Sequence, residues 1–262
     1  MNLNLNDKKR IVIIGDSFTY GHGLKNEYSY PRVLERLLNG SSPDARFEVL
    51  NLGVGGIDID EIYQVALYAL KELKPDFLIY GYFLNDPVEC EVVEPSVKGR
   101  LHESEWAHME IKDFRVAVGG KTRSRPYLKD LLLHSYELSR ISGDTIKWYR
   151  YTHMPENWKF TETLIEQIDA AAAGQNCRFM TALLPVIYKM DDYPLKDVHA
   201  GINKTLSQHN IKVIDCLPFL KMYRDSELYL HPRDRHPNAV YCATVAKALC
   251  GEINPQAEPL RK

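Results

Sequence analysis

The sequence predicts a single α/β domain built on an open, parallel sheet of five strands with helices on both faces. Five short apolar runs have the length and character of buried strands. Helical patterns separate successive runs, and this alternation is typical of a parallel sheet with crossover helices. The chain of 262 residues has the length of one large domain and is short for two.

The first predicted strand and helix have clear boundaries. Residues 10–14, Arg-Ile-Val-Ile-Ile, are apolar on both faces and end at Gly15, as expected of a strand buried inside a parallel sheet. Ser29 then has the character of a helix N-cap, with Pro31 in the first turn and Gly40 as the stop signal.

The second and third strands are predicted at residues 46–51 and 77–82. Between them, Asp58 and Glu61 have the spacing of a capping box at the start of a helix. Apolar residues then recur at helical spacing up to Leu73, so this helix has one buried face.

The last hundred residues resume the alternation of helices and strands. The expected elements are helix 158–173, strand 179–184, helix 194–208, strand 211–214 and helix 237–250.

Residues 87–155 interrupt this pattern, because a simple crossover is much shorter. We expect either a decorative insertion or a lid over the carboxyl edge of the sheet, where open α/β folds bind ligands. Arg123 and Arg125 are candidates to contact an anionic substrate, and Trp148 is a candidate to stack on a sugar or a base. A solvated charge run and packing of the insertion onto the core are the alternatives.

Composition excludes several function classes. Lys and Arg total 33 against 35 Asp and Glu, so the chain lacks the basic excess of a nucleic-acid-binding protein. The first ten residues lack the apolar core of a signal peptide, and no apolar run approaches the roughly 20 residues of a membrane span. We therefore expect a cytoplasmic protein without a nucleic-acid partner or a membrane span.

Cysteine and histidine spacing does not indicate a metal site. Five scattered cysteines form no CxxC pair, which predicts reduced and mostly buried thiols. His102 and His108 lie six residues apart with carboxylates between them, but a surface segment is the favoured interpretation.

Ser17 is the first candidate for chemistry. It lies in the turn Gly15-Asp16-Ser17 after the first strand. A serine in a glycine-flanked turn at the rigid edge of a sheet is well placed to act as a nucleophile. A turn serine that caps a helix is the alternative and more common use.

Two further segments have groups that can stabilise an anion. Gly53, Gly55 and Gly56 follow the second strand, and their backbone N–H groups can point at a developing negative charge. A flexible turn is the alternative, whereas the GxGxxG spacing of dinucleotide binding is missing. Asn85 and Asp86 follow the third strand, where an Asn amide can donate to an oxyanion and an Asx turn is the alternative.

The fourth segment, Asp234-Arg235-His236-Pro237-Asn238, precedes the last predicted helix. A histidine with a nearby carboxylate provides the base and the orienting group that a hydroxyl nucleophile requires. Taken alone, the segment also fits a charged surface loop with a helix cap. His231 is a second candidate base without the following Pro-Asn.

The four segments together resemble the SGNH/GDSL hydrolase family. Their order and wide spacing match the family's blocks, and the resemblance covers the chain apart from the insertion. It implies a doubly wound, flavodoxin-like fold of the SGNH-hydrolase type, with residues 1–262 as one domain. In such a sheet the loops that carry the four segments meet in space.

The resemblance also implies an activity and a set of roles. Ser17 would be the nucleophile, His236 the base, and Asp234 the residue that orients the imidazole. The N–H groups of Ser17 and Gly56 and the side-chain amide of Asn85 would form an oxyanion hole. The implied reaction is hydrolysis of an acyl ester through an acyl-enzyme, without a metal or an organic cofactor.

Two positions depart from the family's usual blocks. Phe83 stands where the third block commonly has glycine, which predicts a reshaped pocket floor. Arg233 stands three residues before His236, where aspartate is common, so Asp234 corresponds to a shorter Asp-x-His spacing found in some relatives.

The expected substrate is a small-molecule acyl ester, with deacetylation of a carbohydrate or a related metabolite preferred. An acyltransferase using the same acyl-enzyme is one alternative. A catalytically silent binding protein on the same fold is another, and the complete set of Ser17, Gly56, Asn85 and His236 argues against it. The sequence specifies neither the acyl chain and leaving group nor whether the chain forms homo-oligomers.

Overall fold

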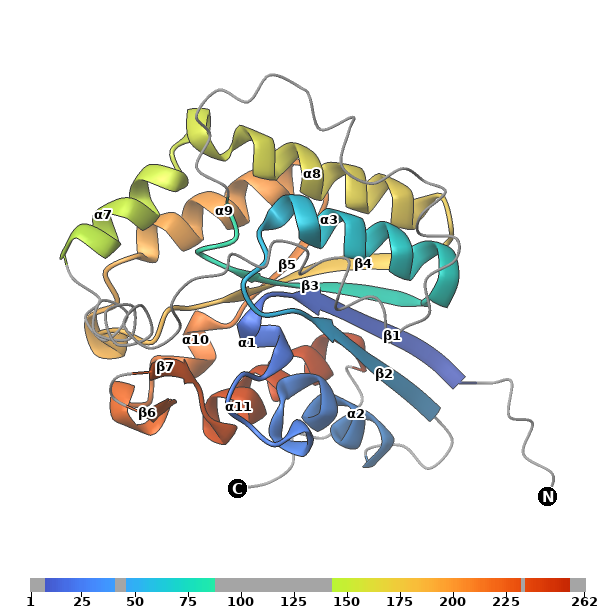
Figure 1. The fold of residues 1–262 in the computed structure, drawn as a ribbon, viewed down its shortest axis with the longest axis horizontal. Coiled ribbons are helices and arrows are strands. Elements are labelled where there is room, and N and C mark those ends of the chain that lie inside the picture. Colours follow the sequence, from blue (N-terminus) through green and yellow to red (C-terminus); the bar gives the residue numbers. More distant parts are fainter. Residues whose placement is uncertain (1–7, 41–45, 88–142, 232–233, 255–262) are drawn as a thin grey trace, which may run out of the picture.

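The computed structural model describes residues 8–40, 46–87, 143–231 and 234–254. These residues form a five-stranded parallel sheet with helices on both faces (Figure 1), so the predicted fold class is confirmed. The strand order is β2-β1-β3-β4-β5, the doubly wound order with β1 next to β3. The strands are β1 (Lys8–Gly15), β2 (Arg46–Gly53), β3 (Phe77–Phe83), β4 (Arg178–Leu184) and β5 (Lys212–Asp215).

The main helices form two layers, one on each face of the sheet (Figure 1). One layer holds α3 (Ile59–Tyr68), which continues into the π-helical turn Ala69–Leu73, together with α8 (Pro155–Ala173) and α9 (Lys196–Gln208). The other layer holds α2 (Tyr30–Gly40) and α11 (Ala239–Ile253), which pack against each other. Each predicted main helix is therefore present, with boundaries shifted by a few residues.

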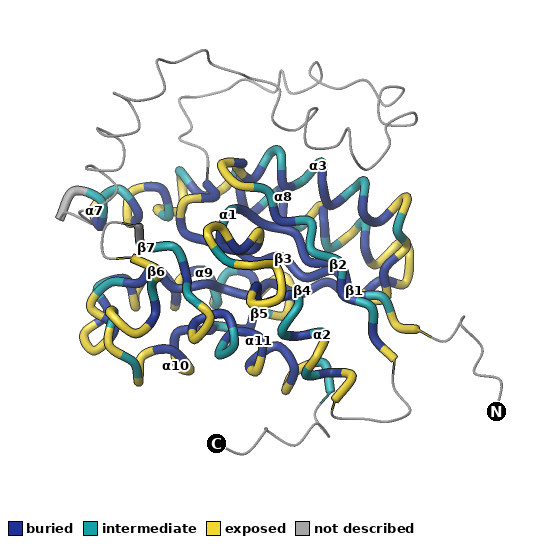
Figure 2. The backbone as a smooth tube through the Cα atoms, turned by 60° about the horizontal axis from the view of Figure 1, so that its bottom comes forward, coloured by how far each residue is buried: buried dark blue, intermediate teal, exposed yellow. Residues whose placement is uncertain are grey.

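The strands are apolar because helices cover both faces of the sheet. Ile11, Val12, Ile13 and Ile14 of β1 are fully buried, and every residue of β3 is buried. Figure 2 shows the same buried centre, with exposed residues on the outer sides of the helices. Burial on both faces explains why these strands lack the alternation of a half-exposed strand.

Glycines leave room for a polar contact at the carboxyl edge of the sheet. Gly15 of β1 pairs with Gly53 of β2 and with Gly81 of β3. A Cβ atom at Gly81 would collide with the hydroxyl groups of Thr19 and Tyr30, which lie 2.8 Å apart and hydrogen bond to each other. The segment after β1 can therefore pack directly onto the ends of its neighbouring strands.

Several short elements were not expected from the sequence. A two-stranded antiparallel sheet joins β6 (Tyr229–His231) to β7 (Asp234–Pro237), where the sequence predicted a loop. The other additions are α1 (Ser17–Tyr20), α7 (Gly143–Thr152), α10 (Leu217–Leu220) and three 3-10 turns, Asn26–Tyr28, Met190–Asp192 and Asp225–Glu227. Strands of three or four residues carry too few positions to show a hydrophobic period.

Most of the predicted insertion at 87–155 lies outside the described residues. Its last part forms α7 and the start of α8. The lid hypothesis, with Arg123 and Arg125, concerns residues that the structure does not describe and stays a prediction.

The cysteines and the lengths of the helices bear on two further expectations from the sequence. Cys177, Cys216, Cys242 and Cys250 are free and buried, as predicted, while Cys90 lies outside the described ranges. Within those ranges, no helix combines the length and apolar character needed to cross a membrane.

Candidate active site

Ser17 is the first residue of a single helical turn that is held at both ends. Asp16 caps the turn, since its Oδ1 accepts a hydrogen bond from the backbone N–H of Phe18 at 2.9 Å. Gly21 ends the turn with a φ of 82°, a left-handed conformation that glycine adopts without strain. The half-buried Ser17 hydroxyl is therefore presented at the carboxyl end of β1.

The structure brings His236 to Ser17. Nε2 of His236 lies 2.9 Å from Oγ of Ser17, although the two residues are 219 positions apart in the chain. His236 is on β7, which packs against both α1 and α11. With Nε2 unprotonated, the Ser17 hydroxyl donates to it, which is the geometry required of a general base.

Two aromatic rings flank the His236 imidazole. The ring of His22 has its centroid 4.5 Å from that of His236, and the ring of Phe18 lies at 5.7 Å. His22 was not among the residues predicted from the sequence, although it lies only five residues after Ser17. The closeness of His22 to Ser17 in the sequence could have identified it as a residue of the site.

Arg235, next to His236, anchors β7 to a neighbouring loop. Its Nη1 donates a hydrogen bond to the carbonyl of Ile187 at 2.8 Å and lies 3.5 Å from Oδ2 of Asp225. The guanidinium carbon lies 5.6 Å from the ring centroids of both Tyr188 and Tyr229. These contacts fix the backbone immediately before His236.

Asp16 is a buried carboxyl group directly beside Ser17. Its Oδ2 lies 3.4 Å from Oγ of Ser17, farther than Nε2 of His236 at 2.9 Å, so the two groups are alternative acceptors for the one hydroxyl proton. Burial raises the pKa of Asp16 to about 6, and hydrogen bonds from Phe18, Ser17 and Asn85 partly oppose this rise. Asp16 therefore links the serine turn to Asn85 on the loop after β3.

Asp86 is a second buried carboxyl group near this edge. Its Oδ2 accepts hydrogen bonds from the Tyr80 hydroxyl at 2.7 Å and from the backbone N–H of Phe83 at 3.0 Å. Its Oδ1 is buried and accepts no hydrogen bond. Burial, followed by the charge of Asp16, raises the pKa of Asp86 well above its usual value.

The glycine loop after β2 lies against the serine turn. The N–H of Val54 donates to the carbonyl of Gly15 at 2.9 Å, and a Cβ atom at Gly55 would lie 3.8 Å from Cβ of Ser17. Gly56 is exposed and has a φ of 78°. Asn85 is exposed and contacts Asp16, so the segments after β1, β2 and β3 meet beside Ser17.

The other candidate residues have different surroundings. The backbone of Asp234 belongs to β7, but its side chain lies outside the described part of the structure. His231 is an exposed residue at the end of β6. Trp148 on α7 is half-buried against the core, with its ring 5.2 Å from that of Tyr149.

Metal-ligating side chains do not gather at Ser17 among the described residues. Among the described residues, the side chains close enough to share a metal ion are Glu162, Glu166 and His209, which lie away from Ser17. At Ser17 itself, the 2.9 Å contact with Nε2 of His236 has the geometry of a hydroxyl beside a general base.

Several solved structures of hydrolases and of a lipolytic protein share this fold. A catalytic serine-to-alanine mutant of Axe2, an acetylxylan esterase from Geobacillus stearothermophilus, superposes with a TM-score of 0.57 at 14% identity, covering 97% of each chain. LAE5, an alpha/beta hydrolase enzyme from the metagenome of Lake Arreo, has a TM-score of 0.54 at 17% identity, again covering 97% of each chain. A protein described as lipolytic and of the G-D-S-L family, from Desulfitobacterium hafniense DCB-2, has a TM-score of 0.51 at 16% identity, covering 92% of this chain and 98% of its own.

No family model matches the chain, and no curated protein sequence matches it either. At these identities the structural similarity defines the fold. The chain therefore has the fold of the SGNH/GDSL hydrolases, as the resemblance in its sequence implied.

Proposed function

We propose that this protein is an ester hydrolase in which Ser17 attacks the acyl carbonyl of a small-molecule ester. The observation that carries the proposal is the distance of 2.9 Å between Oγ of Ser17 and Nε2 of His236. The two groups lie at the carboxyl edge of an open α/β sheet, where such folds bind ligands.

The proposed reaction has two steps, and in each of them His236 accepts one proton and then donates it. In the first, His236 accepts the Ser17 proton as Oγ bonds to the carbonyl carbon, and then donates it to the departing alcohol. This leaves an acyl-enzyme ester on Ser17. In the second, His236 accepts a proton from water as the water attacks the acyl carbon, and returns it to Ser17 as the acid leaves.

The negative charge of each tetrahedral intermediate develops on the former carbonyl oxygen, so hydrogen-bond donors must face that oxygen. We assign this role to the backbone N–H groups of Ser17 and Gly56 and to the side-chain amide of Asn85. The contact of Asn85 with Asp16 and the packing of the glycine loop on Ser17 support this assignment. Loss of one such donor typically lowers the rate about 100- to 1000-fold.

We assign the orientation of the His236 ring to Asp234 on the basis of the Asp-x-His sequence pattern. Asp16 is a poor alternative, because its carboxylate oxygens contact Ser17, Phe18 and Asn85. An orienting carboxylate must also remain charged while the imidazolium forms. Burial of Asp16 disfavours its charged form.

The preferred substrate class is an acetyl ester of a carbohydrate or a related metabolite. Support comes from the Axe2 structures, whose protein acts as an acetylxylan esterase. Since that similarity is one of fold, the substrate is a proposal to be tested directly.

A fluorophosphonate probe tests the nucleophile. The probe should label one peptide, the one that contains Ser17, and the label should disappear in Ser17→Ala. Ser207→Ala serves as the matched control, because Ser207 is an exposed serine on α9. Labelling of another residue, or hydrolysis of p-nitrophenyl acetate unchanged in Ser17→Ala, would refute the proposal. A panel of acetylated sugars and longer acyl esters then ranks the substrates by kcat/KM.

A further inference from the structure

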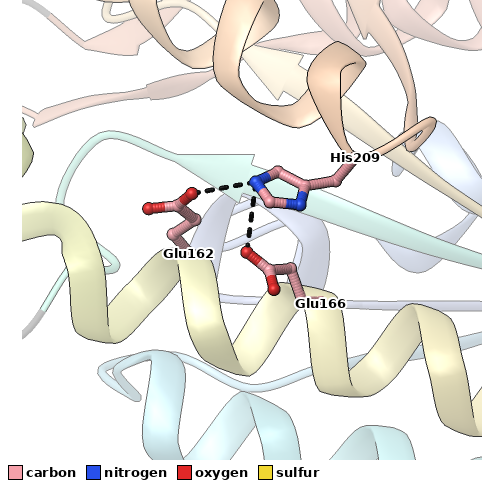
Figure 3. A group of neighbouring side chains, drawn as sticks. All are labelled: Glu162, Glu166 and His209. Atoms are coloured by element: carbon pink, nitrogen blue, oxygen red, sulfur yellow. Dashed lines mark hydrogen bonds and ion pairs between the residues drawn. The ribbon is translucent and has the colours of Figure 1, made fainter.

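Two glutamates and a histidine form a compact cluster between α8 and α9 (Figure 3). Glu162 and Glu166 are one helical turn apart on α8, so their side chains lie on the same face of that helix. His209 follows the last residue of α9. Glu162 is largely buried, whereas Glu166 is half-buried and His209 is at the surface.

The three ligand atoms have the spacing of a metal site. Nε2 of His209 lies 3.0 Å from Oε1 of Glu162 and 3.3 Å from Oε1 of Glu166, and all the ligand atoms lie within 4.8 Å of one another. Zinc binds carboxylate oxygen and imidazole nitrogen at about 2.0–2.2 Å, which places tetrahedral ligands about 3.4 Å apart. Only a small adjustment of a glutamate side chain is needed to surround an ion.

Hydrogen bonds within this cluster leave one carboxylate oxygen without a donor. Nε2 of an imidazole carries at most one N–H, yet two carboxylate oxygens face it (Figure 3). Oε1 of Glu166 is shielded from solvent and accepts no hydrogen bond. A buried carboxylate oxygen without a donor is unfavourable, and a cation between the three groups removes this deficit.

The remaining oxygen of Glu162 already has a partner. Nζ of Lys159 lies 3.1 Å from Oε2 of Glu162, so the carboxylate would bind an ion through Oε1 alone. Two carboxylates and a neutral imidazole would balance the charge of a divalent ion, with water completing a tetrahedron.

We propose that Glu162, Glu166 and His209 bind one divalent cation of the zinc type. The site is separate from the candidate active site. His209 lies three residues before β5 begins, at the amino edge of the sheet, whereas Ser17 follows the carboxyl end of β1. The ion joins α8 to α9 and stabilises the folded chain, because a ligand that binds only the native state shifts unfolding.

Zinc stoichiometry and a cobalt spectrum test the site on the full chain. After chelation and dialysis against Zn²⁺, the wild type should retain one equivalent of zinc and gain several degrees in Tm. Glu166→Gln and His209→Ala should each weaken zinc binding at least tenfold and abolish that gain. Co²⁺ should give visible bands of a tetrahedral site without a thiolate charge-transfer band, which separates this cluster from binding by cysteine.

Glu156→Gln is the matched control, because Glu156 is an exposed residue of the same helix outside the cluster. It should bind zinc as the wild type does. Circular dichroism establishes that the conservative Glu166→Gln variant is folded. If the wild type retains no zinc, or if both cluster variants retain it with unchanged affinity, the cluster is an ion-pair network and the proposal is wrong. Neither outcome depends on esterase activity.

Discussion

The ring of Phe83 stacks on the ring of Phe18, with centroids 3.8 Å apart and 20° between the ring planes. Phe83 stands at the position where the third sequence block of the SGNH/GDSL hydrolases, which this sequence resembles, commonly has glycine. Phe18 directly follows Ser17, and its ring also lies 5.7 Å from that of His236. The aromatic pair therefore fills space beside the serine and the imidazole and supports both.

Phe83→Ala should lower the free energy of unfolding by about 3–4 kcal/mol, because it removes a buried ring and leaves a cavity. It should also reduce kcat/KM, since the Ser17 turn loses its support. Phe83→Leu should cost less in both respects. Chemical denaturation and ester hydrolysis provide the two measurements.

Phe219→Ala is the control for the removal of a ring, because Phe219 on α10 is 48% exposed. Its effect on unfolding should be much smaller. Equal losses in Phe83→Ala and Phe219→Ala would contradict a supporting role for the stack.

His236→Ala should reduce turnover by several orders of magnitude, as the loss of a triad base does. Ser17→Ala should have a similar effect. The double variant should be scarcely worse than either single variant, because the two groups act as one unit. Single-turnover and steady-state hydrolysis of p-nitrophenyl acetate measure these losses.

His22→Ala and His231→Ala separate the base from its neighbours. The ring of His22 lies 4.5 Å from that of His236, but the imidazole within hydrogen-bond distance of Ser17 is that of His236. Each control should lose less than about tenfold in kcat/KM, since neither removes the proton acceptor. A crippling His231→Ala together with a mild His236→Ala would mean that the base is misassigned.

Arg235→Gln should lower kcat about tenfold or more with little change in KM, because Arg235 positions the strand that carries His236. The substitution removes the ion pair with Asp225 and the cation–π contacts with Tyr188 and Tyr229. Arg235→Lys should restore part of the activity, since it keeps the charge. Steady-state kinetics on a single ester distinguishes kcat from KM.

Arg224→Gln is a matched control for Arg235→Gln. The Arg224 side chain is 83% exposed and pairs with Glu227 three residues away. Surface ion pairs of this kind are screened by solvent and contribute little, so activity should be unchanged. A loss of kcat in Arg224→Gln equal to that in Arg235→Gln would argue against a specific role for Arg235.

The large elements of the fold could be predicted because burial leaves a strong pattern. The five main strands lie within a few residues of their expected positions, since helices on both faces demand continuous apolar runs such as residues 11–14. The β6–β7 hairpin was missed because its strands have three and four residues and are partly exposed. Its stability comes from contacts such as those of Arg235 with Tyr188, which are distant in the sequence.

The sequence also indicated which segments would meet, but not how they contact each other. Parallel topology alone requires the segments after β1, β2 and β3 to lie at one edge. That Asp16 bridges Ser17 and Asn85, or that His22 lies beside His236, depends on side-chain directions in a tight turn. Such directions have no periodic signal in the sequence. The burial of Asp86 was hidden for the same reason.

Asp86→Asn should preserve the fold, because burial favours the uncharged form of this carboxyl group and asparagine is a neutral side chain of similar shape. The amide oxygen can accept the hydrogen bonds that Tyr80 and Phe83 now donate. The stability of the variant relative to the wild type should rise with pH. Since the pKa of Asp86 is raised in the folded protein, the folded state holds a proton that the unfolded chain releases above a pH of about 4. Wild-type stability from this group is therefore lost as the pH rises through the folded pKa, and asparagine has no proton to lose.

Urea denaturation of both proteins at several pH values from 5 to 8 measures this difference in the free energy of unfolding. Asp192→Asn is the control, because the side chain of Asp192 is 92% exposed and its removal should add no comparable dependence on pH. Asp86→Ala should be much less stable than Asp86→Asn at every pH, because it leaves the Tyr80 hydroxyl and the Phe83 N–H without their acceptor. If Asp86→Asn instead loses stability relative to the wild type as the pH rises, the buried carboxyl group is stabilised in its charged form. Its unpartnered oxygen would then have to face a cation or a donor.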